Sequence, residues 1–174
     1  LSTQSFAFIP LWGMSQGFQP AVGTNYGAKQ YDRVKQVTKG FIIGATVLTL
    51  IFYIPIQLAP ATLLSWFIKD ANLVSQGVAP FRILFSTYIL LGFLIMAITL
   101  MQSLGKASKA SVLVMLRQIV LFIPLAIIIP MIGGLGVTGV FMAPALTDLV
   151  VVIMAIFMVA SVFRDLTKQA AQEK

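Results

Sequence analysis

Long apolar runs separated by short polar stretches make up most of this chain. Five runs are long enough to cross the roughly 30 Å hydrocarbon core of a bilayer as helices. They occupy residues 6–28, 41–68, 73–104, 111–132 and 140–163, and a polar tail follows at 164–174. The pattern predicts an all-α fold: a polytopic transmembrane helix bundle of five spans.

The second run is longer than the about 20 residues that one span needs. Pro55 and Pro60 lie in its second half, and each removes a backbone donor and crowds the preceding turn. We therefore expect a break near these two prolines. For the same reason we expect helix kinks at Pro20, Pro124 and Pro144, inside the first, fourth and fifth runs.

The composition also indicates a membrane protein. Of the 174 residues, 59% are hydrophobic and 10% are charged, and the mean hydropathy is +0.96. These values lie outside the range of soluble globular domains. The chain has no cysteine and no histidine, which excludes disulfides, thiol chemistry and histidine proton shuttles or metal ligands. We expect no enzyme, no metal site and no bound cofactor.

The basic residues are distributed as topology signals. The stretches after the first and third runs and the tail hold nine of the twelve: Lys29, Arg33, Lys35, Lys39, Lys106, Lys109, Arg164, Lys168 and Lys174. The two remaining connections contain only Lys69. Because cytoplasmic loops are enriched in Lys and Arg, we expect an external N-terminus and a cytoplasmic C-terminus in a plasma (bacterial inner) membrane. The net charge of +7 therefore does not indicate a nucleic-acid partner.

The first run is too polar for a helix that faces only lipid. It carries amides and glycines, and an unpaired amide in hydrocarbon costs free energy. The residues leave two interpretations open: a packed bundle helix with paired amides, or a helix that lines a cavity. Its candidates for a substrate-cavity wall are Gln16, Gln19, Asn25 and Tyr26. Its glycine pairs, Gly13 with Gly17 and Gly23 with Gly27, are expected to allow close approach of another helix.

Three ionisable residues lie inside the runs, where each costs at least about 2.5 kcal/mol without a partner, water or a path to the interface. Arg82 either reaches the outer interface or lines an external cavity. Arg117 is expected to hold helix-end carbonyls or a carboxylate. Asp148 is the only carboxylate inside any run. It is a candidate either for proton or cation coupling or for a structural anchor with a basic or backbone partner.

Three segments resemble the multidrug and toxic compound extrusion (MATE) transporters. They are Q-P-A-V-G-T-N-Y-G-A-K-Q-Y-D-R-V at 19–34, Q-S-L-G-K-A-S-K-A-S-V-L-V-M-L-R-Q-I-V-L-F-I-P-L at 102–125, and P-A-L-T-D at 144–148. The resemblance implies the last five of twelve spans, a partial C-terminal lobe whose N-terminal lobe in the same protein is missing. It also implies efflux of small organic, often cationic compounds in exchange for H⁺ or Na⁺.

The chain departs from part of that family pattern. Some members have acidic residues for a cation site on the span that corresponds to the third run, but the central polar groups here are Ser86, Thr87 and Tyr88. The alternatives are a lipid-linked oligosaccharide flippase of the same superfamily and a non-transporting membrane subunit. A flippase is expected to need several cations in its cavity, and a subunit has no need of a carboxylate at mid-depth.

Overall fold

The computed structural model describes residues 2–132 and 136–172, and every element in them is a helix. The elements are α1 (Ser2–Gly27), α2 (Tyr31–Leu58), α3 (Pro60–Ser65), α4 (Ala71–Leu84), α5 (Tyr88–Ser103), α6 (Ala107–Met115), the π-helix η1 (Leu116–Phe122), α7 (Ile123–Met131) and α8 (Gly136–Gln172). The all-α prediction is confirmed.

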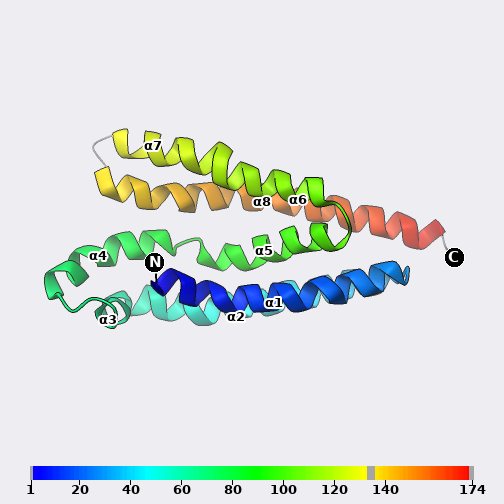
Figure 1. The fold of residues 1–174 in the computed structure, drawn as a ribbon, viewed down its shortest axis with the longest axis horizontal. Helices are drawn as coiled ribbons and strands as arrows, with labels where there is room; N and C mark the ends of the chain where they lie inside the picture. The colour runs from blue at the N-terminus through cyan, green and yellow to red at the C-terminus, as the bar shows by residue number, and fades with distance from the viewer. Residues whose placement is uncertain (1, 133–135, 173–174) are drawn as a thin grey trace.

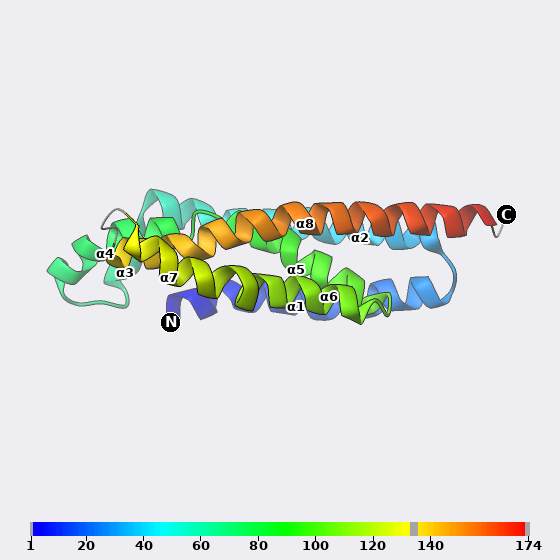
Figure 2. The same ribbon diagram turned by 90° about the horizontal axis from the view of Figure 1, so that it is seen from above.

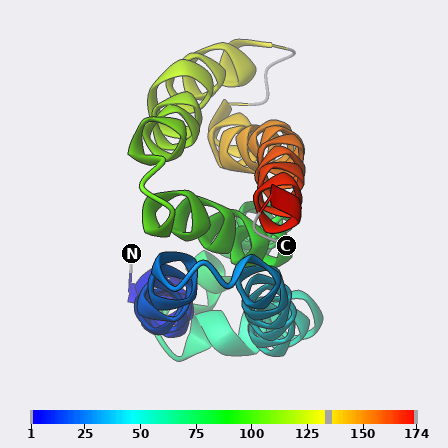
Figure 3. The same ribbon diagram turned by 90° about the vertical axis from the view of Figure 1, so that its right-hand side faces the viewer.

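The long helices run side by side along one axis (Figure 1). One antiparallel pair is α1 with α2, and a second is the continuous α6–η1–α7 rod with α8 (Figure 2). Viewed along the bundle axis, α5 lies between the two pairs (Figure 3). This central position explains why α5 is the most buried helix, with Tyr88, Leu94 and Leu100 almost inaccessible.

The second and third predicted runs are both interrupted. α2 ends at Leu58 and Pro60 begins α3, so the break lies at Pro60, whereas Pro55 stays inside α2. A proline is tolerated in the first turn of a helix because its missing N–H has no intrahelical partner there. The third run is divided into α4 and α5, which are bent by 42° at the connection between them. The fifth predicted run corresponds to α8, which extends past the predicted end at 163 to Gln172.

Three helical stretches are long and apolar enough to cross a membrane: Tyr31–Leu58, Ala107–Met131 and Thr138–Gln172. The bent pair α4–α5 makes a fourth if it counts as one span. Among the described residues α1 does not belong to this group, although it has 26 residues. Its amides and glycines lower its hydropathy, so a fifth span at 6–28 stays a prediction.

Close helix packing uses glycines other than the predicted pairs. A Cβ at Gly92 of α5 would lie 2.9 Å from the Ala45 carbonyl oxygen of α2, so these two backbones can approach only without a side chain there. At Gly13, Gly17, Gly23 and Gly27, an added Cβ would meet no described atom within 4 Å. The predicted close approach at those pairs is not made by the part of the chain described here.

The basic residues gather at one end of the bundle. The α1–α2 turn, the α5–α6 turn and the C-terminal end of α8 lie together at the right of Figure 1. Lys106 bonds Asp165 at 3.1 Å, and Lys35 donates to the Thr167 hydroxyl at 3.3 Å. The predicted basic stretches are therefore neighbours in space, and Lys174 lies outside the described residues.

Candidate functional site

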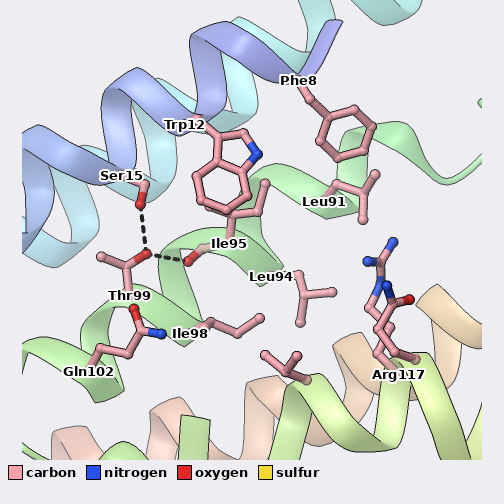
Figure 4. A pocket seen from close by; sticks show the side chains of 12 residues that line it. Phe8, Trp12, Ser15, Leu91, Leu94, Ile95, Ile98, Thr99, Gln102 and Arg117 are labelled. Atoms are coloured by element: carbon pink, nitrogen blue, oxygen red, sulfur yellow. Dashed lines mark hydrogen bonds between the residues drawn. The ribbon is translucent and has the colours of Figure 1, made fainter. Parts of the chain in front are cut away.

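A groove of about 330 Å³ opens between α1, α5 and the α6–η1 segment (Figure 4). We call it the α1–α5 groove. Its lining residues are Phe8, Trp12, Ser15, Leu91, Leu94, Ile95, Ile98, Thr99, Gln102, Val114, Arg117 and Gln118. The lining is mostly apolar, with a few polar groups, as is usual for small-molecule sites in proteins.

One face of α1 contributes Phe8, Trp12 and Ser15, which are four and three residues apart and so share a helical stripe. The Ser15 and Thr99 hydroxyls lie 3.1 Å apart and join α1 to α5 at one side of the groove. Thr99 also donates to the Ile95 carbonyl at 2.9 Å. Figure 4 shows this chain of hydrogen bonds at one side of the groove, near Gln102.

Arg117 reaches the groove from η1, where it is partly exposed. Its Nε donates to Asp148 Oδ1 of α8 at 2.7 Å, and the Thr87 hydroxyl donates to Oδ2 at 3.4 Å. Asp148 is only 2% exposed, so its charge depends on these partners. The carboxylate thus joins three elements, η1, α8 and the α4–α5 connection, directly behind the groove.

The π-helix that carries Arg117 ends just before Pro124. Pro124 has no N–H and crowds the carbonyl four residues earlier, so the regular α-helical pattern is disturbed in this segment. The seven residues Leu116–Phe122 form a π-helix, which has wider turns than an α-helix, and the α-helix continues after it as α7. Such turns change the direction of the side chains they carry and occur often at functional sites. Here the turn carries Arg117 and Gln118.

The four predicted cavity residues of α1 are not among the lining residues of the groove. Gln16 and Gln19 are exposed, and Gln19 extends the stripe of Phe8, Trp12 and Ser15 by one turn. Asn25 donates to the Ala21 carbonyl at 2.7 Å within its own helix, and the Tyr26 ring packs against Tyr31 at a centroid distance of 5.8 Å. Their place in a cavity wall stays a prediction.

Arg82 is not among the lining residues of the groove and makes different contacts. Its Nε and Nη2 donate to the Gln57 carbonyl at 3.1 and 2.6 Å, and the Gln57 amide donates back to the Arg82 carbonyl. A guanidinium on one of the last carbonyls of α2 satisfies an acceptor that has no intrahelical donor and favours the negative end of the helix dipole.

Sequence reasoning missed most of the groove. Phe8, Trp12 and Ser15 form a helical stripe that precedes the amides of the first run, and Thr99 is a polar residue within the apolar stretch 89–101. Both were visible signals, but only the tertiary packing tells which stripes meet. No cluster of three or more acidic side chains that could hold a metal ion occurs in residues 2–132 and 136–172.

Comparison with known proteins gives the family. The MatE family model matches residues 1–128. A search of curated proteins found no match. The MATE multidrug transporter DinF-BH, whose structure was solved in complex with a ligand, is 36% identical, with a TM-score of 0.83 over 90% of this chain and 35% of that one.

Two more distant structures show the same fold. A MATE in complex with MaL6 is 21% identical, with a TM-score of 0.86 over 93% of this chain and 37% of that one. The inward-facing form of a multidrug resistance MATE family transporter is 20% identical, with a TM-score of 0.85 over 94% and 38%. The chain spans little more than a third of the length of these relatives. It is a multi-pass membrane protein and belongs to the MatE family.

Proposed function

We propose that this chain forms most of the C-terminal lobe of a secondary active exporter, which moves organic, often cationic compounds out of the cell in exchange for H⁺ or Na⁺. The observation that carries the proposal is the α1–α5 groove, an apolar hollow with a buried ion pair directly behind it. Membership of the MatE family supports transport rather than catalysis. The N-terminal lobe would then be the main partner.

The proposed mechanism is rocking of two pseudo-symmetric lobes around a central cavity, as in transporters built from repeats. The α1–α5 groove would be this lobe's share of the cavity wall, with Gln16 and Gln19 extending it. The bend between α4 and α5 and the π turn of η1 are places where such helices can change shape. We place the basic end of the bundle in the cytoplasm, because Lys and Arg are retained there.

Asp148 has two candidate roles in this mechanism. As a coupling group, Asp148 would bind a proton or a cation and would release Arg117 when it does so. As an anchor it would hold η1, α8 and the α4–α5 connection together throughout the cycle. Its two oxygens both accept hydrogen bonds from protein donors, which favours the anchor. Asp148→Asn in the complete transporter separates the two, since undiminished ion-driven efflux would exclude coupling at this residue.

The direct test is efflux of ethidium, a fluorescent organic cation, from cells that express the complete gene. We expect less ethidium retention than in vector controls, and we expect an ionophore for the coupling ion to abolish the difference. Comparing a protonophore with a sodium ionophore identifies the ion. Equal retention across ethidium and a broad panel of other compounds would contradict drug export.

The flippase alternative is less well supported by the groove. A lipid-linked pyrophosphate needs several cations close together, whereas Arg117 is the one basic residue in the groove lining. Arg82 is engaged at the end of α2. A cavity in the complete protein that gathers further Arg and Lys from the N-terminal lobe would revive this alternative.

A further inference from the structure

The α1–α5 groove has an unexpected charge for a site that exports cations. Arg117 is the one ionisable side chain among its lining residues. The chain has five acidic residues, and Asp32, Asp70 and Asp165 lie at or near helix ends, away from the lining. Glu173 lies outside the described residues. Asp148 is buried behind Arg117, so the described part of this chain presents no carboxylate to a ligand in the groove.

The guanidinium of Arg117 bonds the buried Asp148 carboxylate on one side and borders the groove on the other. Its Nε is used by Asp148, and within the described residues neither Nη1 nor Nη2 has a hydrogen-bond partner. The side chain is 27% exposed and borders the groove, whereas the Asp148 side chain is 3% exposed. Figure 4 shows Arg117 rising from η1 toward the side of the groove that holds Leu91 and Phe8. The groove is therefore lined by the positive member of the Arg117–Asp148 ion pair, while the negative member is buried behind it.

The rest of the lining suits a flat apolar body. Phe8 and Trp12 offer aromatic faces or edges, and Leu91, Leu94 and Ile95 form an aliphatic wall. The two Nη groups of an arginine match the two oxygens of a carboxylate. A volume of about 330 Å³ lies at the small end of the range for ligand sites, so one or two fused rings with a short acidic substituent would fit.

We propose that the α1–α5 groove binds aromatic carboxylates, with Arg117 holding the carboxylate and Trp12 and Phe8 packing on the rings. The proposal rests on the proposed function, because it names a ligand class for the same cavity. An organic cation would gain only ring and aliphatic contacts from this lobe, and any countercharge for it would have to come from outside the described residues.

Two ligands with the same ring system but opposite charge test this in the purified complete transporter: 2-naphthoate and 2-naphthylmethylammonium. Equilibrium dialysis measures both affinities. We expect Arg117→Gln/Asp148→Asn to weaken naphthoate binding about tenfold or more, the usual loss of a charged hydrogen bond, and to leave the ammonium ligand unchanged or tighter. The double variant is used because it leaves no unpaired buried charge.

Two further variants keep the test independent of folding defects in the double variant. Asp148→Asn retains Arg117 and removes the carboxylate that competes for it, so naphthoate should bind as tightly as before or more tightly. Trp12→Ala should weaken both ligands to similar extents. Ile153→Ala, on an exposed apolar face of α8 outside the groove lining, should change neither affinity.

Naphthoate binding that is unaffected by the double variant, or equally weakened for both ligands, would overturn the proposal. So would weaker naphthoate binding in Asp148→Asn, because a structural role of the ion pair predicts that loss. These outcomes are separable from failure of the proposed function. A transporter that exports ethidium while binding naphthoate independently of Arg117 refutes only the carboxylate site at Arg117. One that binds naphthoate through Arg117 without any efflux refutes only the export.

Discussion

Two ion pairs connect the fourth predicted run and the turn before it to α8, and they differ in their surroundings. Arg117–Asp148 is 2.7 Å long with a carboxylate that is 3% exposed, whereas Lys106–Asp165 is 3.1 Å long with a carboxylate that is 44% exposed. Desolvation makes a buried charge strongly dependent on its partner, while an exposed charge keeps its water. The first pair should therefore govern stability and function, and the second should matter little.

The largest expected effect is removal of the cation from the buried pair. Arg117→Gln leaves the Asp148 carboxylate buried without its counterion, and we expect a loss of about 3–5 kcal/mol in the free energy of unfolding. Unfolding of the purified complete transporter in detergent measures this loss. The double variant Arg117→Gln/Asp148→Asn should recover much of it. If the single variant is as stable as the double, the buried carboxylate does not depend on Arg117.

A smaller effect is expected from the second donor to the same carboxylate. Thr87→Val removes the hydroxyl 3.4 Å from Asp148 Oδ2 and should cost about 1 kcal/mol. Thr147→Val is a matched control, because that buried hydroxyl bonds the Ala143 carbonyl of its own helix. Equal unfolding midpoints for the two variants would mean that Thr87 contributes nothing particular to Asp148.

The exposed pair should show its effect through pH. The hydrogen bond and charge of Lys106 lower the pKa of Asp165, which lies beyond the predicted span 140–163 in the polar tail region. A lowered pKa in the folded state stabilises the protein above the ordinary aspartate value of about 3.9. That contribution should be lost as the pH falls through the lowered value. Unfolding midpoints of the unmodified protein and Asp165→Asn should therefore converge toward low pH and differ most above about pH 5.

The smallest expected effect is that of salt. At 1 M salt the screening length is about 3 Å, so the exposed Lys106–Asp165 pair should weaken while the buried pair is little affected. A double-mutant cycle at low and high salt compares the two coupling energies. A strong salt dependence of the Arg117–Asp148 coupling would mean that water and ions reach the Asp148 carboxylate, contrary to its 3% exposure.

The long apolar runs predicted the all-helical bundle well, because helix length in a membrane is set by a simple physical dimension. The charge pattern also predicted that the basic stretches meet at one end. The position of a helix break was harder to predict where two prolines lie close together in the sequence. Pro55 and Pro60 have equal intrinsic tendencies to break a helix, and only Pro60 lies at the break because it begins a new helix.

The candidate site was predicted in part. Arg117 and Asp148 stood out individually because a charge in a membrane span needs a partner, but their sequence separation gave no sign that they pair with each other. The π turn that positions Arg117 depends on Pro124, which the sequence indicated only as a kink. Ser15 and Thr99 were overlooked because a single hydroxyl in a helix can always bond its own backbone.

The central claim is that the α1–α5 groove is open to water and ligand within the membrane region. Since this chain has no cysteine, Ser15→Cys and Gln102→Cys introduce single thiols on the groove lining, with Ile153→Cys as the apolar-face control, in a complete transporter freed of other cysteines. The account predicts that a membrane-impermeant thiol reagent labels the first two, that bound ligand protects them, and that the control stays unlabelled. Groove thiols that stay unreactive with and without ligand, under both directions of the ion gradient, would contradict it.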